Sequence, residues 1–230
     1  GSEMCIRDRP PLSKNIIFVF RRTLPSMDNL QQHHDPHLLP SSTNDEDIIQ
    51  KPLDDDLPWY ALRLFTLKTQ QVIDYLEEHH LVYFIPMEYV DVEDRKHRVQ
   101  QKLRPVVRNL IFIKRTMSEL SIRRILTEAP FKGSVIRKSR EDRQYYEIPS
   151  RQMFEFQAMC NPEIVMRQYL SEAQAKLKVG TPVYVKYGPL KGLSGRLVRS
   201  NKKYFLLKEI PGLGVMLKVS RWCCRPMVEE

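Results

Sequence analysis

Apolar and polar residues alternate in a regular pattern along two stretches of the chain, and these patterns predict two folded regions. In the first, Trp59 to Phe65 alternates as a β-strand, and apolar residues at helical spacing follow over Gln70 to His79. In the second, alternation over Val183 to Tyr187 is typical of a half-buried strand. Gly188-Pro189 then breaks this strand, and another strand begins at Gly195.

The first region continues with further predicted elements. Thr66 or Thr69 can cap the first helix, and Ser118 or Ser121 can open a second one. The remaining elements are a strand over 83–90, a strand within 100–114 that is strongest at 110–113, the helix through Leu126, a short strand at Val135-Ile136 and a helix over 152–159. This order predicts an α+β fold in which helices flank an antiparallel sheet.

These patterns divide the chain into four parts. Residues 1–57 form a tail, 58–160 a first domain, 161–177 a linker with some helix, and 178–227 a small β-barrel. The tail is rich in Pro, Ser and Asp and shows no period, so we expect it to be disordered. Gly1-Ser2 is compatible with a cloning remnant, and no function is inferred from the first ten residues.

Charge is distributed unevenly along the chain. The net charge is +9, and residues 178–225 hold eleven Lys or Arg against one acid, Glu209. Residues 1–57 instead hold six basic and ten acidic residues. The positive field therefore belongs to the folded parts, which favours a polyanionic partner.

Several function classes are not supported by the residues. No CxxC pair, Gly-rich phosphate loop before a helix or spaced catalytic triad is present, so we expect no enzyme, cofactor or metal. His33, His34 and His37 are close in sequence but lie in the expected tail. The apolar run Ile16–Phe20 is too short to span a membrane. Together these features predict a cytoplasmic monomer with reduced thiols.

The glycine-containing stretch Val179–Arg196 resembles the KOW motif, and its position relative to Trp59-Tyr60 extends the resemblance. A strand-helix-strand unit followed about 120 residues later by a KOW module resembles the NusG family over residues 58–225. The chain looks most like specialised paralogues of the RfaH type and of Bacteroidales capsular-polysaccharide operons. The resemblance implies an NGN domain followed by an SH3-like KOW barrel.

In this family the NGN domain docks on RNA polymerase through apolar residues of its sheet. The resemblance assigns this role to Tyr60, Leu62, Phe84, Pro86, Val106, Val107, Leu110 and Phe112. An alternative is that half of them fill the core, because alternate strand residues must face inward. Val107-Arg108-Asn109-Leu110 also departs from the aromatic family pattern.

The resemblance also implies nucleic-acid contacts. Ser121, Arg123 and Arg124 align with a segment that touches non-template DNA, although a solvated helix face is the alternative. Arg95 to Arg98 is a second basic candidate. The KOW face would meet ribosomal protein or RNA through a set of cations: Lys186, Lys191, Arg196, Arg199, Lys202 and Lys203. Pro211–Leu217 replaces the family's usual loop, which argues against Rho as a partner.

The sequence therefore predicts a transcription elongation or antitermination factor. It would bind RNA polymerase through the NGN domain, suppress pausing or termination on specific operons, and recruit a second partner through the KOW domain. The alternative is a KOW-type RNA-binding or ribosome-associated protein. The domain between Trp59 and Phe112 favours the first hypothesis, because ribosomal KOW proteins lack it.

Overall fold

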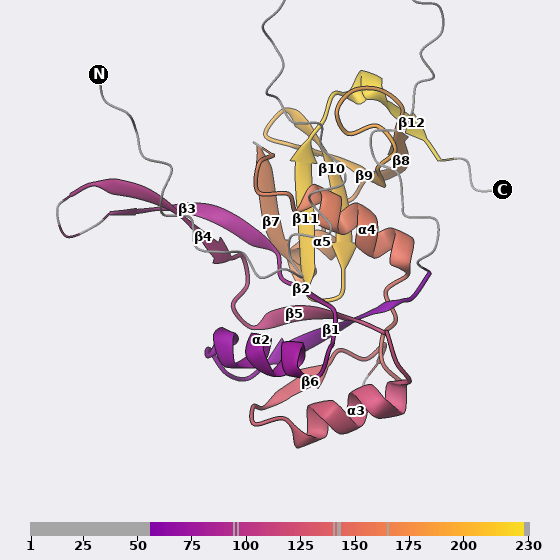
Figure 1. Ribbon diagram of the computed structural model, residues 1–230. Coiled ribbons are helices and arrows are strands. Elements are labelled where there is room, and N and C mark those ends of the chain that lie inside the picture. The colour runs from indigo at the N-terminus through magenta and orange to yellow at the C-terminus, as the bar shows by residue number, and fades with distance from the viewer. Residues whose placement is uncertain are drawn as a thin grey trace, which may run out of the picture. The chain divides into compact units, whose positions relative to one another are not determined.

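The computed structural model describes residues 56–227, except 94, 96, 140, 142, 143 and 165. Most of the expected tail, the three tail histidines and the run Ile16–Phe20 lie outside the described residues. The described part is an α+β structure with antiparallel sheets, as the sequence predicts (Figure 1).

The first sheet has the strand order β2-β5-β1-β6. Its strands are β1 (Trp59–Leu64), β2 (Tyr83–Phe84), β5 (Leu110–Lys114) and β6 (Gly133–Val135). β1 and β5 are buried at nearly every position, which explains their almost continuous apolar sequences. A sheet buried in this way must be covered on both faces.

Three helices cover the first sheet. Helices α2 (Thr69–Glu78) and α3 (Glu119–Glu128) lie below it in Figure 1, and α4 (Ser150–Met159) lies above it. Ser118 caps α3, because its Oγ accepts a hydrogen bond from Ser121 N at 3.1 Å. Neither Thr66 nor Thr69 caps α2. Lys68 occupies the N-cap position, and the backbone N–H of Lys68 donates a hydrogen bond to Thr66 Oγ1 at 3.2 Å.

A two-stranded ribbon projects from this first region (Figure 1). It consists of β3 (Met87–Glu93) and β4 (Val99–Pro105), which pair from Met87 opposite Pro105 to Glu93 opposite Val99. The single strand expected over 83–90 is divided, because Ile85-Pro86 separates β2 from β3. Proline has no N–H for a sheet ladder, so the chain changes partner there.

The second sheet has six strands in the order β12-β8-β9-β10-β11-β7. Its strands are β7 (Arg167–Ser171), β8 (Thr181–Val185), β9 (Ser194–Ser200), β10 (Lys203–Ile210), β11 (Leu213–Lys218) and β12 (Cys224–Pro226). A short helix, α5 (Glu172–Lys176), and a 3-10 turn, η1 (Arg221–Cys223), complete this region.

Residues 161–177 do more than connect two regions. β7 pairs with β11 along its whole length, and α5 begins with a capping box formed by Ser171 and Gln174. Ala175 of α5 is buried with Val198, Phe205, Leu207 and Met216. The segment expected as a linker therefore contributes a strand and a helix to the second sheet.

Helix α4 lies between the two sheets. It is buried at Met153, Glu155, Phe156, Gln157 and Met159, which occupy more than one helical face. Phe156 packs edge-on against Phe112 of the first sheet at a centroid distance of 5.7 Å, and Gln152 Nε2 donates to Glu209 O of β10 at 3.0 Å. A helix that contacts two sheets has little surface left for solvent, which explains its weak amphipathic pattern.

Candidate functional site

The residues expected to contact polymerase fall on two faces of the first sheet. In an antiparallel pair, directly opposite residues share a face, and neighbours along a strand alternate. Tyr60 lies opposite Ile113 and Leu62 opposite Ile111, whereas Ala61 lies opposite Phe112. Tyr60 and Leu62 are therefore on one face, and Phe112 is on the other.

The face that carries Tyr60 and Leu62 is closed by other parts of the first region. The Tyr60 ring packs edge-on against Tyr145 at 5.4 Å, and its hydroxyl donates to Glu147 Oε1 at 3.4 Å. Burial is the main cause of the raised pKa of Tyr60. A Cβ atom at Gly133 would lie 3.3 Å from Cδ1 of Leu62, so β6 packs closely there. In this structure both residues belong to the core.

The opposite face carries Phe84, Leu110 and Phe112. Phe84 is opposite Phe112, with their rings 6.4 Å apart, and Arg63 is opposite Leu110. All three apolar residues are buried, whereas Arg63 is exposed. α4 covers Phe112, as described above, and the turn between β10 and β11 covers Leu110.

That turn, Pro211-Gly212, is the part of the second sheet that meets the first. Gly212 has a φ of 92°, and a Cβ atom there would lie 3.0 Å from Cδ2 of Leu110 and 3.4 Å from Cδ1 of Ile136. Its N–H donates to Glu172 Oε2 at 2.9 Å. The segment that departs from the family pattern in sequence is thus a contact between the two regions.

The remaining expected apolar residues lie at the base of the ribbon. Val106 N donates to Pro86 O at 2.9 Å, which places them side by side next to the pair Met87 and Pro105. Pro86 is buried, and Val106 and Val107 are half-buried. The eight expected residues therefore form three groups, two on opposite faces of the sheet and one at the ribbon base.

The expected DNA-binding residues of α3 have partners within their own helix. Arg123 Nη2 contacts Glu119 Oε1 at 2.6 Å, and Arg124 Nε contacts Glu128 Oε1 at 2.9 Å. Ser121 Oγ is 2.8 Å from Ser118 Oγ. Two cations and two carboxylates balance, so α3 offers less positive charge than its arginines alone suggest.

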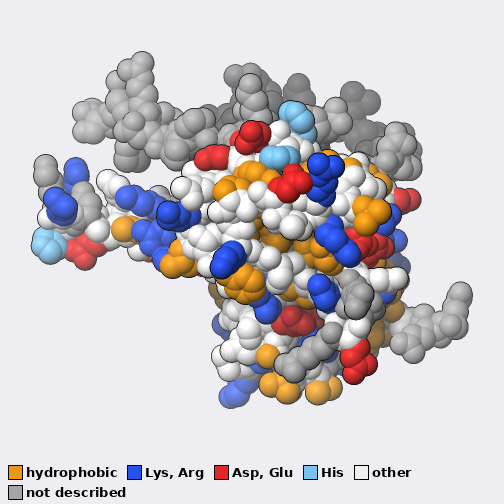
Figure 2. Space-filling view, turned by 90° about the horizontal axis from the view of Figure 1, so that it is seen from below, with side chains coloured by type: hydrophobic (Ala, Val, Ile, Leu, Met, Phe, Trp, Pro, Cys, Tyr) orange, Lys and Arg blue, Asp and Glu red, His pale blue; other side chains and the backbone are white. Residues whose placement is uncertain are grey.

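The ribbon is a second basic surface. Exposed Arg95, Arg98, Lys102 and Arg104 lie along it, and Figure 2 shows Lys and Arg side chains gathered on this arm. Acidic residues of β3 accompany them, since Glu88 lies opposite Arg104 in the strand register. The His97 ring also pairs with Glu93. The ribbon is therefore mixed in charge rather than purely basic.

The cations expected on the second sheet separate into structural and exposed groups. Arg196 is structural, because its guanidinium donates to Glu209 Oε2 at 2.8 Å and to the carbonyls of Lys178 and Ala175 at 2.9 and 3.0 Å. Lys191 is half-buried. The exposed cations of the expected set are Lys186, Arg199, Lys202 and Lys203.

A buried polar cluster between α4 and the second sheet was not predicted. Glu155 of α4 pairs with Lys208 of β10 and accepts hydrogen bonds from Ser194 Oγ at 2.6 Å and Ser194 N at 3.2 Å. Arg151 Nε reaches its other oxygen at 3.2 Å. The sequence carries a signal for this cluster, namely a glutamate between Phe154 and Phe156 and a lysine after Leu206-Leu207.

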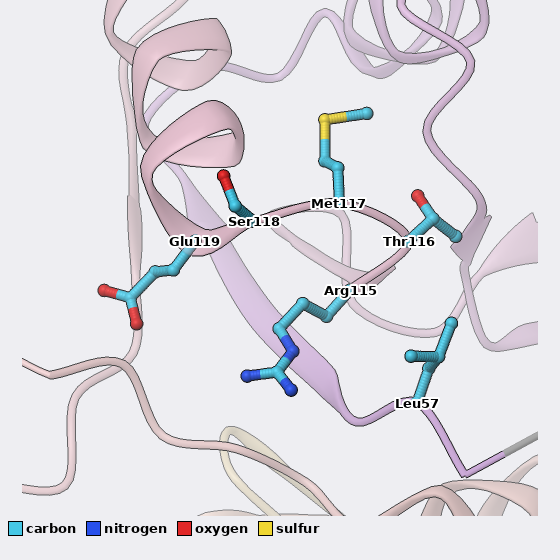
Figure 3. Close-up of a pocket in the computed structure, with 6 residues that line it drawn as sticks. All are labelled: Leu57, Arg115, Thr116, Met117, Ser118 and Glu119. Atoms are coloured by element: carbon cyan, nitrogen blue, oxygen red, sulfur yellow. The ribbon is translucent and has the colours of Figure 1, made fainter.

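A hollow of about 270 Å³ lies where the chain passes from β5 into α3 (Figure 3). Its lining residues are Leu57, Arg115, Thr116, Met117, Ser118 and Glu119. Arg115 is bound to Glu147 Oε1 at 2.6 Å, and Glu119 to Arg123. Because both charged side chains already have partners, the hollow shows no group poised for chemistry.

Metal and membrane features were also sought in the described part of the chain. No group of three or more His, Cys, Asp or Glu side chains could hold a metal ion there. Among the same residues, no helix is long and apolar enough to cross a bilayer.

The decisive comparison concerns the first region, with its four-stranded sheet, ribbon and helices. Residues 57–157 match the family model of NusG, described as transcription termination factor nusG. This match supports membership of the NusG family and covers the first sheet, the ribbon and most of α4. We call residues 57–157 the NusG-type domain. A search of curated proteins found no significant match to the chain.

Proposed function

We propose that the protein is a transcription elongation and antitermination factor of the specialised RfaH type. The observation that carries this proposal is the match of residues 57–157 to the NusG family model. In this proposal the protein acts by binding and catalyses no reaction. Its NusG-type domain binds RNA polymerase and suppresses pausing or termination on particular operons. The second sheet is a KOW domain that recruits another partner.

The face that carries Phe84, Leu110 and Phe112 is the proposed polymerase side of the domain. Arg63 is an exposed residue of this face, opposite the buried Leu110 in the strand register. The turn at Gly212 lies over Leu110, so a polymerase that reaches Leu110 must displace this turn. In our proposal, polymerase can therefore reach this face only when the two sheets are not in contact at the Gly212 turn.

Retention on core RNA polymerase tests the proposed function. The full chain should be retained on immobilised polymerase and should increase transcription through a terminator on its native leader. Retention on ribosomes or ribosomal RNA, with none on polymerase, would favour the ribosome-associated alternative instead.

Substitutions for mapping the surface must avoid the core. Changing Tyr60 or Phe112 to Ala removes a fully buried ring, which destabilises a domain by about 3–5 kcal/mol and mimics a loss of binding. Arg63→Glu changes an exposed residue and should weaken retention on polymerase. Lys102→Glu on the ribbon is the charge-matched control, and equal losses in both variants would place the polymerase surface elsewhere.

A further inference from the structure

Two adjacent cysteines, Cys223 and Cys224, lie at the junction of η1 and β12. We propose that they form a reversible redox pair, in which a hydroperoxide oxidises Cys223 and Cys224 then closes a disulfide with it. The reduced thiols expected from the sequence are the resting state of this pair. The inference does not depend on the proposed function, because neither RNA polymerase nor a second partner takes part in the reaction.

The two thiols differ in their access to solvent. Cys223 is half-buried, whereas Cys224 is 6% exposed and its Sγ donates a hydrogen bond to Ser220 O at 3.6 Å. A peroxide in solution therefore meets Cys223 before Cys224. Cys160, the other described cysteine, is 1% exposed, so a dissolved oxidant has no access to it in the native fold.

The fold holds the two cysteines at one backbone group. The Cys223 N–H donates to Ser220 O at 3.0 Å, and the Cys224 thiol donates to the same oxygen. After burial, the charge of a nearby Cys223 thiolate is the second cause of the raised pKa of Cys224. Two groups held this close react within one molecule, which favours a bond between them over a bond to another chain.

The two steps balance in atoms and electrons. The Cys223 thiolate attacks one oxygen of the hydroperoxide, the O–O bond breaks, and the sulfur becomes a sulfenic acid. The Cys224 sulfur then attacks the sulfenic sulfur, the S–O bond breaks, and hydroxide leaves. The two thiols lose two electrons, and their two protons end in one water and one alcohol, or in two waters when the oxidant is hydrogen peroxide.

A disulfide between neighbours in the chain is strained, and the strain makes the reaction reversible. Consecutive Cα atoms lie about 3.8 Å apart across a trans peptide, below the roughly 4.4 Å at which ordinary disulfides begin. A strained disulfide is more easily reduced by thiols than a structural one. The bond between Cys223 and Cys224 is therefore suited to a transient change and not to permanent stabilisation.

Closure of the disulfide affects the edge of the second sheet. Lys186 N donates to Cys223 O at 2.8 Å, and Cys224 lies opposite Val185 in the register of β8 and β12. β12 has three residues, and β8 is its one neighbour in the described sheet. The strained bond acts on both contacts at once, so oxidation should detach β12 from β8 while the inner strands remain paired.

Peptide mapping of the full chain after treatment with hydrogen peroxide tests the proposal. The peptide that contains both cysteines should lose two hydrogen atoms and regain them on addition of dithiothreitol. Fragment ions distinguish this loss from the oxygen that peroxide adds to Met227, which is 50% exposed. The bond should form between Cys223 and Cys224 and should appear in the monomer.

Two variants separate the roles of the thiols. In Cys224→Ser no thiol is available to resolve the sulfenic acid, so dimedone, which traps sulfenic acids, should label Cys223 in this variant and much less in the wild type. Cys160→Ala is the matched control and should leave formation of the disulfide unchanged. Circular dichroism would confirm that both variants remain folded.

Hydrogen exchange tests the structural consequence. The amides of Lys186 and of Met227, which donates to Pro182 O at 3.0 Å, should exchange faster in the oxidised protein and return to their original rates after reduction. The amide of Leu206 is the internal control, because β10 is paired with β9 and β11 at this residue. Its exchange should not change.

Three results would overturn the proposal. The first is sulfinic acid on Cys223 of the wild type with no internal disulfide, and the second is a bond from Cys223 to Cys5, to Cys160 or to another chain. The third is unchanged exchange at Lys186 in a fully oxidised sample. None of these measurements involves polymerase, so a failure here is distinguishable from a failure of the proposed function.

Discussion

Glu155 of α4 and Lys208 of β10 form an ion pair almost out of contact with water. Their side chains are 4% and 11% exposed, and Ser194 supplies two hydrogen bonds to the same carboxylate oxygen. Lys208 Nζ also donates to Ser194 O at 3.2 Å. This cluster joins the NusG-type domain to the second sheet, because Glu155 lies within residues 57–157 and Lys208 does not.

Lys208→Ala should strongly destabilise the protein. It leaves the Glu155 carboxylate buried with less compensation, and breaking a buried pair in this way costs about 3 kcal/mol. Urea unfolding followed by tryptophan fluorescence measures the change, because Trp59 is buried in the first sheet. Lys203→Ala removes an exposed cation from the same strand and should change the free energy of unfolding by less than about 0.5 kcal/mol. Similar effects in the two variants would contradict a special role for the pair.

A second prediction concerns the turn over Leu110. Gly212→Ala should destabilise the protein for two reasons: a positive φ strains any side chain, and the new Cβ lies 3.0 Å from Leu110. Gly188→Ala is a matched control, because its φ is 88° and no atom lies within 4 Å of the added Cβ. The control should lose about 1 kcal/mol from strain alone. The Gly212 variant should lose more.

Binding to polymerase can also be compared between Gly212→Ala and Gly188→Ala. If the Gly212 turn and polymerase compete for Leu110, Gly212→Ala should increase retention on polymerase, whereas Gly188→Ala should not. Lower retention of the Gly212 variant, at unchanged folding, would show that contact between the sheets assists binding rather than opposing it.

The strand periods were readable from the sequence because they depend on local burial. β1, β8 and α3 form where strands and a helix were predicted, and Val183 and Val185 alternate with exposed neighbours as expected; β1, however, is buried at nearly every position instead of alternating. β7 was missed because Arg167-Gln168-Tyr169 has no apolar alternation, and it is held by pairing with β11 instead. An edge strand that is stabilised by its neighbour leaves little trace in its own residues.

The candidate polymerase surface was harder to predict for a different reason. Periodicity tells which residues of one strand share a face, but not how two strands are aligned. The strand register sets Ala61, rather than Tyr60, opposite Phe112, and so places Tyr60 and Phe112 on opposite faces of the sheet. A register shift of one residue would place them on the same face. The carboxylate partners of Arg196 and Lys208 likewise come from other segments of the chain. From the sequence alone, both cations are therefore expected at the surface.

A third prediction concerns the thiols. Burial raises the pKa of Cys160 to about 12, and burial also raises the pKa of Cys224. Iodoacetamide at pH 8 should therefore modify both slowly in the native protein and rapidly after unfolding, since the thiolate is the reactive form. Cys223 is half-buried and should react before them. Peptide mapping by mass spectrometry gives the order, and fast native labelling of Cys160 would contradict its burial.

The last prediction is a pH dependence at Glu172. Burial acts to raise the pKa of this carboxyl, but hydrogen bonds from Lys176 and the Gly212 N–H, with the nearby charges of Lys176 and Arg63, lower it overall. A folded-state pKa below the ordinary value of 4.5 means that the ionised group stabilises the fold above that value. The contribution is lost as the pH falls through the lowered folded pKa.

Glu172→Gln should separate this contribution from general acid unfolding. Above pH 5 the wild type should be the more stable protein by a constant margin, and the margin should shrink as the pH falls below 4.5. Unfolding free energies measured from pH 7 to pH 3 test this. Lys176→Gln removes one hydrogen-bond donor to Glu172 but keeps the bond from the Gly212 N–H. The wild type should therefore exceed Lys176→Gln in stability by a smaller margin, with the same dependence on pH. A margin independent of pH would show that Glu172 acts through packing, and not through its charge at the Gly212 turn.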